Sequence, residues 1–169
     1  MSNTVLEFDG VDILFSAELG RKRETALKSA LQQLDAGRNR NEIESATGVV
    51  VGVCQASLTV QRGQISVLMG LSGSGKSTLL RAANGLNRVT RGRVLVNDGE
   101  KQIDVAKCDA ATLRRLRRGT IAMIFQQFGL LPWRTVEENV GFGLELAGVP
   151  EAERKKMCYG NAMRLYGLV

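Results

Sequence analysis

The sequence of 169 residues contains no histidine, only two prolines, three cysteines and few aromatic residues (5%). Any chemistry of this chain must therefore proceed without an imidazole. No stretch approaches the roughly 18 consecutive apolar residues of a membrane-spanning helix, and the N-terminus has early acidic residues and no apolar signal core. We therefore expect a cytoplasmic protein that reaches a membrane only through a partner.

The cysteines, Cys54, Cys108 and Cys158, are odd in number and far apart in the sequence. Neither a disulfide framework nor a metal-ligand spacing is visible, which indicates a reducing compartment. We expect each thiol to be a small buried apolar group rather than a reactive one.

Lysine and arginine exceed aspartate and glutamate by 23 to 17, and the basic residues are dispersed except for an arginine cluster at 114–118. Such a cluster can bind nucleic acid or anionic lipid. Here no aromatic residues interleave it, and Leu113 and Leu116 would face inward from a helix over 110–118. We therefore expect a solvated helix face and no nucleic-acid partner.

The most informative feature that is present is a match to the phosphate-binding loop G-x-x-x-x-G-K-[ST]. An apolar run at 64–69 predicts a buried strand before it, and residues 77–83 predict a helix behind it. A phosphate-binding loop of this kind lies between a strand and a helix, in that order along the chain. The predicted nucleotide-binding residues are Gly70, Leu71, Ser72, Gly73, Ser74, Gly75, Lys76, Ser77 and Thr78.

The residue types of this loop suit the phosphates of ATP and a Mg²⁺ ion. Gly73 and Gly75 lack a Cβ and let backbone N–H groups approach a phosphate closely. The positive end of the following helix adds to the attraction. Lys76 would reach the β- and γ-phosphates, and the Ser77 hydroxyl would ligate Mg²⁺. Thr78 would serve the helix N-terminus or add a phosphate contact.

The remaining pattern predicts alternating strands and helices, with no internal repeat. Residues 21–47 predict a helical pair inserted between two strands, its second helix capped by Asn41. Strands are expected at 5–15 (one or two, at a sheet edge), 49–53, 57–60, 93–96, 103–106 and 121–125. Helices are expected at 25–34, 41–45, 110–118, 136–146 and 151–168.

Beyond the phosphate loop, residues 121–136 read IAMIFQQFGLLPWRTV, with Glu138-Asn-Val140 behind them. This stretch resembles the Q-loop of the ATP-binding subunits of ABC transporters, which lies about fifty residues after the phosphate loop. With the insertion at 21–47, the chain is similar to the importers of quaternary amines such as glycine betaine, choline and proline betaine. The run at 130–136 also occurs in taurine, sulfonate and nitrate importers, which remain an alternative.

The resemblance implies roles for single residues. Gln126 matches the Q-loop glutamine, which would ligate Mg²⁺ together with Ser77 and sense the γ-phosphate. Phe15 matches the aromatic position that stacks on adenine, although Tyr is more usual there. The apolar residues Leu130, Leu131 and Trp133 are either core or a patch that docks a membrane permease. The family also implies pairing with a second ATP-binding subunit.

Three parts of the family's hydrolytic machinery have no counterpart in these 169 residues. They are the Leu-Ser-Gly-Gly-Gln-like signature, an apolar strand ending in Asp-Glu, and the switch histidine. No catalytic residue can therefore be named. We expect Mg²⁺-assisted nucleotide binding with turnover near background, from the N-terminal portion of an ABC ATPase. A small P-loop kinase, or a nucleotide-sensing module without catalysis, is the alternative from another class.

The expected fold class is α/β. The resemblance implies a RecA-like P-loop NTPase core with an antiparallel β edge subdomain and the start of the ABC helical subdomain. We expect residues 1–169 to form one incomplete ATP-binding domain. Its parts would be the insertion at 21–47, the phosphate loop and helix at 64–85, the Q-loop at 121–136 and the helical subdomain from 136 to 169.

Overall fold

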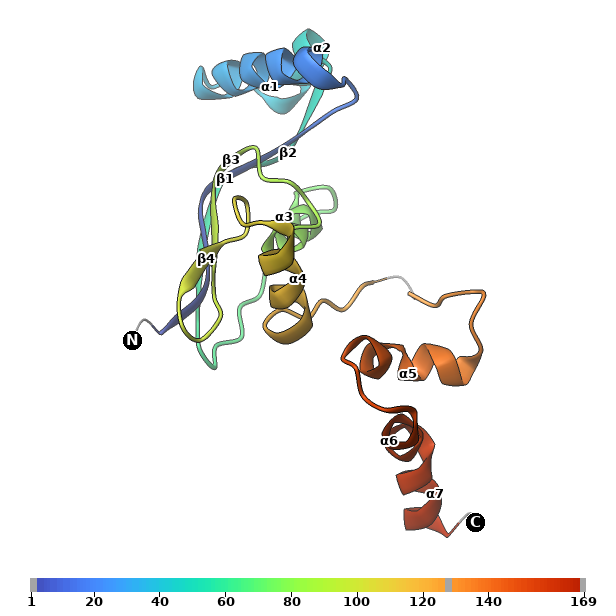
Figure 1. The fold of residues 1–169 in the computed structure, drawn as a ribbon. Helices are drawn as coiled ribbons and strands as arrows, with labels where there is room; N and C mark the ends of the chain where they lie inside the picture. The colour runs from blue at the N-terminus through green and yellow to red at the C-terminus, as the bar shows by residue number, and fades with distance from the viewer. Residues whose placement is uncertain (1–2, 127–128, 168–169) are drawn as a thin grey trace. The chain divides into compact units, whose positions relative to one another are not determined.

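The computed structural model describes residues 3–126 and 129–167 (Figure 1). They fall into two compact units, Met1–Ala122 and Met123–Val169. None of the helices among the described residues combines the length and the apolar character that a membrane crossing requires.

The first unit is built on one antiparallel sheet of four strands in the order β2-β1-β3-β4. Residues 5–15 were expected at a sheet edge, but β1 pairs with β2 on one side and with β3 on the other. The edge prediction was wrong because the alternating pattern reports burial and not the number of neighbouring strands. The strands are β1 (Thr4–Ser16), β2 (Val49–Gln61), β3 (Arg91–Asn97) and β4 (Gln102–Asp104).

β2 is a single long strand where the sequence predicted two. Its local irregularity falls at Gln55, whose φ is 43°, and the pairing of β1 with β2 shifts register around it. A register shift of this kind bends a strand without ending it. The sequence pattern therefore broke at 54–56, although the strand continues through these residues.

The expected helical insertion is present as α1 (Gly20–Asp35) and α2 (Arg40–Thr47), which lie beyond one end of β1 and β2 (Figure 1). Asn39, and not Asn41, caps α2: its side chain accepts from the Glu42 N–H while Glu42 reaches back to the Asn39 N–H. The pair has a small core of its own, made of Leu14, Ala30, Ile43, Val49 and Val51.

The main core of the first unit lies between the sheet and two helices, α3 (Lys76–Ala83) and α4 (Ala110–Gly119). Phe8, Val11 and Val94 are buried on the sheet, Leu79 comes from α3, and Leu116 comes from α4. Asp109 caps the N-terminus of α4, and its side chain accepts from the Thr112 N–H. This core fixes the helix that follows the phosphate loop against the sheet.

Two predicted buried strands are not strands in the structure. Residues 64–69 and 121–125 carry no strand assignment. Several of their apolar side chains are exposed, 91% for Ile65, 87% for Met69 and 97% for Ile124, while Leu68 and Ile121 are half-buried against the main core. An apolar strand in a parallel sheet is stable only between neighbouring strands. Among the described residues the four strands pair antiparallel with one another, so these two runs lack the partners that the prediction assumed.

The second unit is helical. The predicted helix at 136–146 is α5 (Val136–Leu146). The helix predicted at 151–168, described as far as residue 167, runs through three segments, α6 (Glu151–Lys155), a π-helical turn η1 (Lys156–Gly160) and α7 (Asn161–Tyr166). Only Gly141 is buried among the described residues of this unit. Its helices are therefore held by few apolar contacts.

The thiols are less buried than predicted. Cys54 is exposed on β2, and Cys108 and Cys158 are half-buried. Cys54 is exposed because the side chains of a strand alternate between two faces and those of its neighbours Val53 and Val51 point to the core. All three cysteines are free, in agreement with the sequence, which showed no disulfide framework.

Candidate phosphate-binding site

The phosphate loop runs directly into α3, which starts at Lys76 after Gly75. Gly75 has a φ of 93°, and a Cβ there would lie 2.3 Å from the Gly52 carbonyl oxygen of β2. Only glycine fits so close to a neighbouring backbone with positive φ. Gly75 thus lets β2 and the start of α3 meet.

Lys76 closes the loop on itself. Its ammonium donates to the carbonyl oxygens of Gly70 at 2.8 Å and Leu71 at 2.7 Å, and to the Ser74 hydroxyl at 3.2 Å. The Ser74 N–H also donates to the Leu71 carbonyl at 3.2 Å. The Lys76 ammonium is therefore held inside the loop by neutral oxygens, and a negatively charged phosphate oxygen can replace them with a stronger bond.

The first turn of α3 supplies N–H groups that have no partner within the helix. Among the described residues, no side chain caps this helix, and no acidic residue occupies its first turn. An anion at this end would gain from the helix dipole as well as from the N–H groups. The loop, the helix end and Lys76 together form a site suited to a phosphate.

The two hydroxyl residues that follow Lys76 differ in their surroundings. Ser77 is exposed at the start of α3, whereas Thr78 is half-buried. The Thr78 methyl group lies against Gly52, and the Thr78 carbonyl accepts from the Asn87 side chain at 3.0 Å. Thr78 therefore helps to anchor the helix, and Ser77 is the hydroxyl that a bound ion can reach.

Phe15 lies beside the same helix end, through Gly52. A Cβ added to Gly52 would lie 2.7 Å from the Phe15 ring and 3.2 Å from the Thr78 methyl group. Phe15 is 42% exposed, so the residue packs partly on β2 and is partly open to solvent. The structure thus brings together Phe15 and the phosphate loop, which are 55 or more residues apart in the sequence.

Gln126 belongs to the second unit, and its side chain is exposed. Its role as a Mg²⁺ ligand stays a prediction. Residues 127–128 of the predicted Q-loop lie outside the described residues. Within the apolar run that follows, Leu130 and Trp133 are exposed, 69% and 77%, and Leu131 is half-buried. Of the two interpretations left open, core or surface patch, the exposure favours the surface patch.

Asn139 organises the turn before α5, a role that sequence reasoning missed. Its side-chain oxygen accepts from the Leu131 N–H at 2.8 Å, and its amide donates to the carbonyls of Leu131 and Arg134 at 3.1 Å. Thr135 and Glu138 form a capping box at the start of α5. The spacing of Thr135 and Glu138 was the signal in the sequence that could have located this cap.

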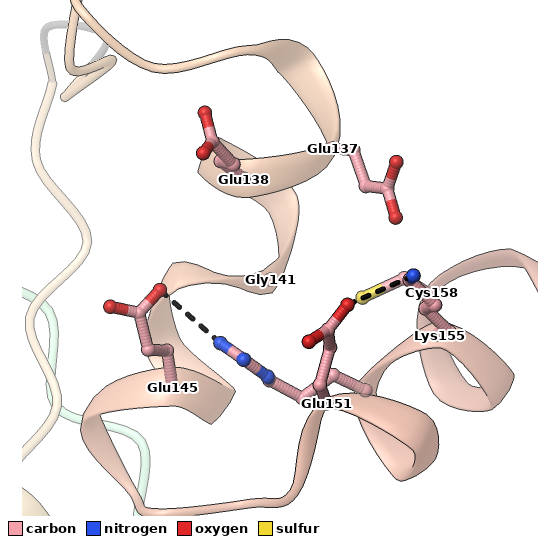
Figure 2. A pocket seen from close by; sticks show the side chains of 8 residues that line it. Glu137, Glu138, Gly141, Glu145, Glu151, Lys155 and Cys158 are labelled. Carbon is pink, nitrogen blue, oxygen red and sulfur yellow. Dashed lines mark hydrogen bonds and ion pairs between the residues drawn. The ribbon is translucent and has the colours of Figure 1, made fainter.

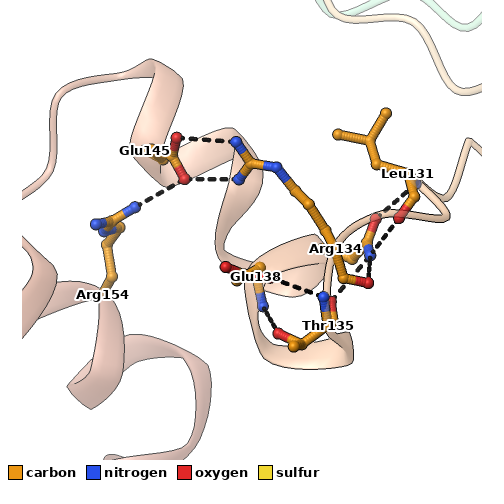
Figure 3. Close-up of polar contacts among 7 residues, drawn as sticks. Leu131, Arg134, Thr135, Glu138, Glu145 and Arg154 are labelled. Atoms are coloured by element: carbon orange, nitrogen blue, oxygen red, sulfur yellow. Dashed lines mark hydrogen bonds and ion pairs between the residues drawn. The ribbon is translucent and has the colours of Figure 1, made fainter.

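Glu145 of α5 binds two arginines, Arg134 just before this helix and Arg154 on α6 (Figure 3). Arg134 binds it with both terminal nitrogens, at 2.8 and 3.2 Å, and Arg154 approaches it at 3.2 Å. The hydrogen bond from Arg134 and the nearby charge of Arg154 lower the pKa of the Glu145 carboxyl. Arg134 also stacks on the Phe142 ring, 4.7 Å from its centroid.

A pocket of about 300 Å³ opens beside this network (Figure 2). Four of its charged groups form ion pairs: Lys155 binds Glu151 at 2.9 Å, and Arg154 binds Glu145 at 3.2 Å. The pocket is therefore an ion-paired packing surface of the helices. It is lined by Glu137, Glu138, Gly141, Glu145, Glu151, Arg154, Lys155 and Cys158.

The family model of the ABC transporter matches residues 53–168, which include the phosphate loop and the predicted Q-loop. The chain belongs to the ABC transporter family. This membership and the solved relative below confirm the expected α/β fold class. Within that class, the structure forms the antiparallel sheet, the helix behind the phosphate loop and the helices after residue 135.

Two curated relatives are ATP-binding subunits of glycine betaine transporters. The glycine betaine/proline betaine transport system ATP-binding protein ProV of Salmonella typhimurium is 46% identical over 82% of this chain and 34% of its own length. The glycine betaine transport ATP-binding protein OpuAA of Bacillus subtilis is 45% identical over 83% of this chain and 32% of its own length. The chain thus spans about a third of the length of these relatives.

One similar solved structure is an ATP-binding cassette in a dimeric, post-hydrolysis state bound to ADP and Pi. It aligns with a TM-score of 0.63 at 25% identity, over 89% of this chain and 53% of that protein. The cassette fold is therefore shared over most of the present residues.

Proposed function

We propose that this chain binds ATP or ADP with Mg²⁺ through residues 70–78. The observation that carries the proposal is the closed phosphate loop, in which the Lys76 ammonium rests on the carbonyls of Gly70 and Leu71 at the N-terminus of α3. A loop already wrapped around its lysine loses little conformational entropy when a phosphate enters.

The proposed roles follow from the position of each residue. Lys76 neutralises the β- and γ-phosphates, and the exposed Ser77 hydroxyl ligates Mg²⁺. Phe15 stacks on the adenine with the open part of its ring, which its place over Gly52 supports. Gln126 is proposed as a second Mg²⁺ ligand on the grounds of sequence alone.

We further propose that the chain is the ATP-binding part of an importer, located in the cytoplasm at the inner face of the cell membrane. The printed names of the two curated relatives favour glycine betaine or a similar quaternary amine as the transported solute. The exposed Leu130 and Trp133 are proposed to dock a membrane permease. Pairing with a second ATP-binding subunit is supported by the dimeric state of the solved relative.

The arginine cluster does not favour the kinase alternative. Arg115 pairs with Asp98 at 2.9 Å, and Arg117 donates to the Asn84 carbonyl at 2.8 Å. Two arginines of the cluster therefore support the structure of the first unit. A phosphotransferase lid would need them free to contact a phosphate.

Calorimetric titration of the purified chain with Mg²⁺-ATP tests the proposal. We expect Lys76→Ala to weaken binding at least about a hundredfold, because the variant loses the charge that meets the phosphates. Lys101→Ala, an exposed lysine in the turn before β4, is the matched control and should bind like the wild type.

Two results would contradict the proposal. Equal affinities of the wild type and Lys76→Ala would show that the phosphate loop does not bind the nucleotide. Steady, Lys76-dependent phosphate release from the wild-type chain would refute the expectation of background turnover, which rests on the lack of an Asp-Glu pair and of histidine in these residues.

A further inference from the structure

Asp12 is a buried carboxylate in the middle of β1, three residues before Phe15. Its side chain is fully buried. It accepts from the Gln55 N–H of β2 at 2.7 Å and from the Arg91 guanidinium at the start of β3. A buried charge persists only when it is paired and hydrogen-bonded. Asp12 therefore ties together three neighbouring strands at one point.

This point is where the pairing of β1 with β2 changes register. Shifts fall between Val11 and Ile13 and between Ile13 and Leu14. Gln55 is the one non-glycine among the described residues with positive φ. Irregularities of this kind re-aim the side chains that follow them. By fixing the Gln55 N–H, Asp12 fixes how the stretch Val49–Val53 lies against Phe15.

Asp12, Gln55 and Arg91 together form a clamp across three strands, and Arg91 also connects this clamp to the helical insertion. Its Nη1 donates to Asp35 at the end of α1, at 2.8 Å. The neighbouring Thr90 strengthens the same junction, because its N–H donates to the Asp12 carbonyl at 2.8 Å and its hydroxyl accepts from the Leu14 N–H at 3.0 Å. β1 is thus fastened to the start of β3 on both sides of Ile13.

The position of β2 against β1 affects the candidate site through Gly52. Gly52 touches the Phe15 ring and Thr78, and its carbonyl meets Gly75. A slip of β2 against β1 would change how Phe15 lies against Gly52 and α3, whereas the bonds from Lys76 to the Gly70 and Leu71 carbonyls are made within the phosphate loop itself. The part of the site near the base and the part near the phosphates therefore depend on different contacts.

We infer that Asp12 and Arg91 are positioning residues that set the base-contacting side of the nucleotide site, by holding Phe15 and Gly52 against the start of α3. This inference rests on the proposed function. It assigns to the pair a contribution to adenine recognition and none to phosphate binding.

The test compares Mg²⁺-ATP with Mg²⁺-tripolyphosphate, which carries the phosphates without the base. In Arg91→Gln we expect the ATP dissociation constant to rise about three- to tenfold and that of tripolyphosphate to change less than about twofold. Arg93→Gln is the matched control, because the exposed pair Arg93–Asp9 joins the same two strands away from Gly52. Its ATP affinity should stay at the wild-type value.

A double-variant cycle separates positioning from a general structural role. If Arg91 acts through Phe15, adding Arg91→Gln to Phe15→Ala should cause no further loss of ATP affinity. Should Arg91→Gln fail to fold because Asp12 loses its partner, Asp12→Asn/Arg91→Gln removes both charges and takes its place.

The possible outcomes show separately whether the positioning role of Asp12 and Arg91 fails or whether the proposed nucleotide binding itself fails. Equal weakening of ATP and tripolyphosphate, unchanged ATP affinity in Arg91→Gln, or additive losses in the cycle would each overturn the inference alone. A wild-type chain that binds neither ligand would overturn the proposed function, and with it this inference.

Discussion

The two units of this chain are stabilised in different ways. Every buried apolar side chain that the structure describes lies in Met1–Ala122, where the sheet packs on α3, on α4 and on the helical insertion. In Met123–Val169 the described contacts are caps, a bidentate arginine pair and exposed ion pairs. Apolar burial contributes far more to folding than exposed ion pairs do. We therefore expect the first unit to have a larger free energy of unfolding than the second.

The aromatic residues allow the two units to be observed separately. The single tryptophan, Trp133, and both tyrosines, Tyr159 and Tyr166, lie in the second unit. Their fluorescence reports on Met123–Val169 alone. Hydrogen exchange at the backbone of β1 and β3 reports on the first unit.

The largest expected effect compares the same substitution in both units. Phe8→Ala empties a site that is 1% exposed, and we expect the first unit to lose about 3 to 5 kcal/mol of unfolding free energy. Phe142→Ala, in the half-buried ring under Arg134, should cost the second unit about 1 kcal/mol. Hydrogen exchange and Trp133 fluorescence in denaturant measure the two values. Equal losses would refute the proposed difference between the units.

A smaller effect is expected from the polar contacts that order the second unit. Asn139→Ala removes the hydrogen bonds that hold the turn before α5. We expect a loss of about 1 kcal/mol, because a hydrogen bond made in place of one to water contributes only modestly. Thermal unfolding followed by Trp133 fluorescence measures it. Asn161→Ala, on an exposed asparagine of α7, is the control and should leave the transition unchanged.

The smallest effect is the response to acid. The folded pKa of Glu145 is lowered from 4.5 by Arg134. Its contribution is therefore present above about 4.5 and is lost as the pH falls through the lowered folded value. In the first unit, hydrogen bonds from the Lys101 and Glu100 N–H groups and from Arg115 lower the pKa of Asp98 from 3.8 to about 2. Its contribution survives to lower pH.

A pH titration tests this order of loss. We expect Trp133 fluorescence to change below about pH 4.5. The NMR signal of the Asp98 carboxyl should show that this group stays ionised until the pH is near 2. Glu145→Gln removes the titrating group and should flatten the fluorescence change. A fluorescence change of the same size in that variant would show that the arginine pair does not hold the second unit.

Local chemistry predicted the helices well. The run at 136–146 and the arginine-rich run at 110–118 became α5 and α4 within one residue, because caps and apolar spacing act within a few residues. The cap of α2 was misplaced from Asn39 to Asn41, since two asparagines stand close together and only the bond to Glu42 decides between them. The strand at the start of the chain was recognised, but its neighbours in the sheet were not.

The candidate site likewise has a part that the sequence predicts and a part that it does not. Gly70, Lys76 and Ser77 could be predicted from spacing alone, because the loop is contiguous in sequence. The placement of Phe15 and Thr78 beside Gly52 could not be derived from composition or periodicity, because it depends on the register of β1 against β2. The clamp of Asp12, Gln55 and Arg91 was missed because its members lie on three strands.

The amino-acid sequence by itself determined the phosphate loop, the helix behind it and the family, because a glycine-rich loop and its lysine act within nine consecutive residues. Only the tertiary structure decided which apolar runs are strands. Residues 64–69 and 121–125 have the composition of buried strands, yet they form no strand, and Ile65, Met69 and Ile124 are exposed. A strand exists only through hydrogen bonds to a neighbouring strand, and that neighbour is not encoded in the strand's own residues.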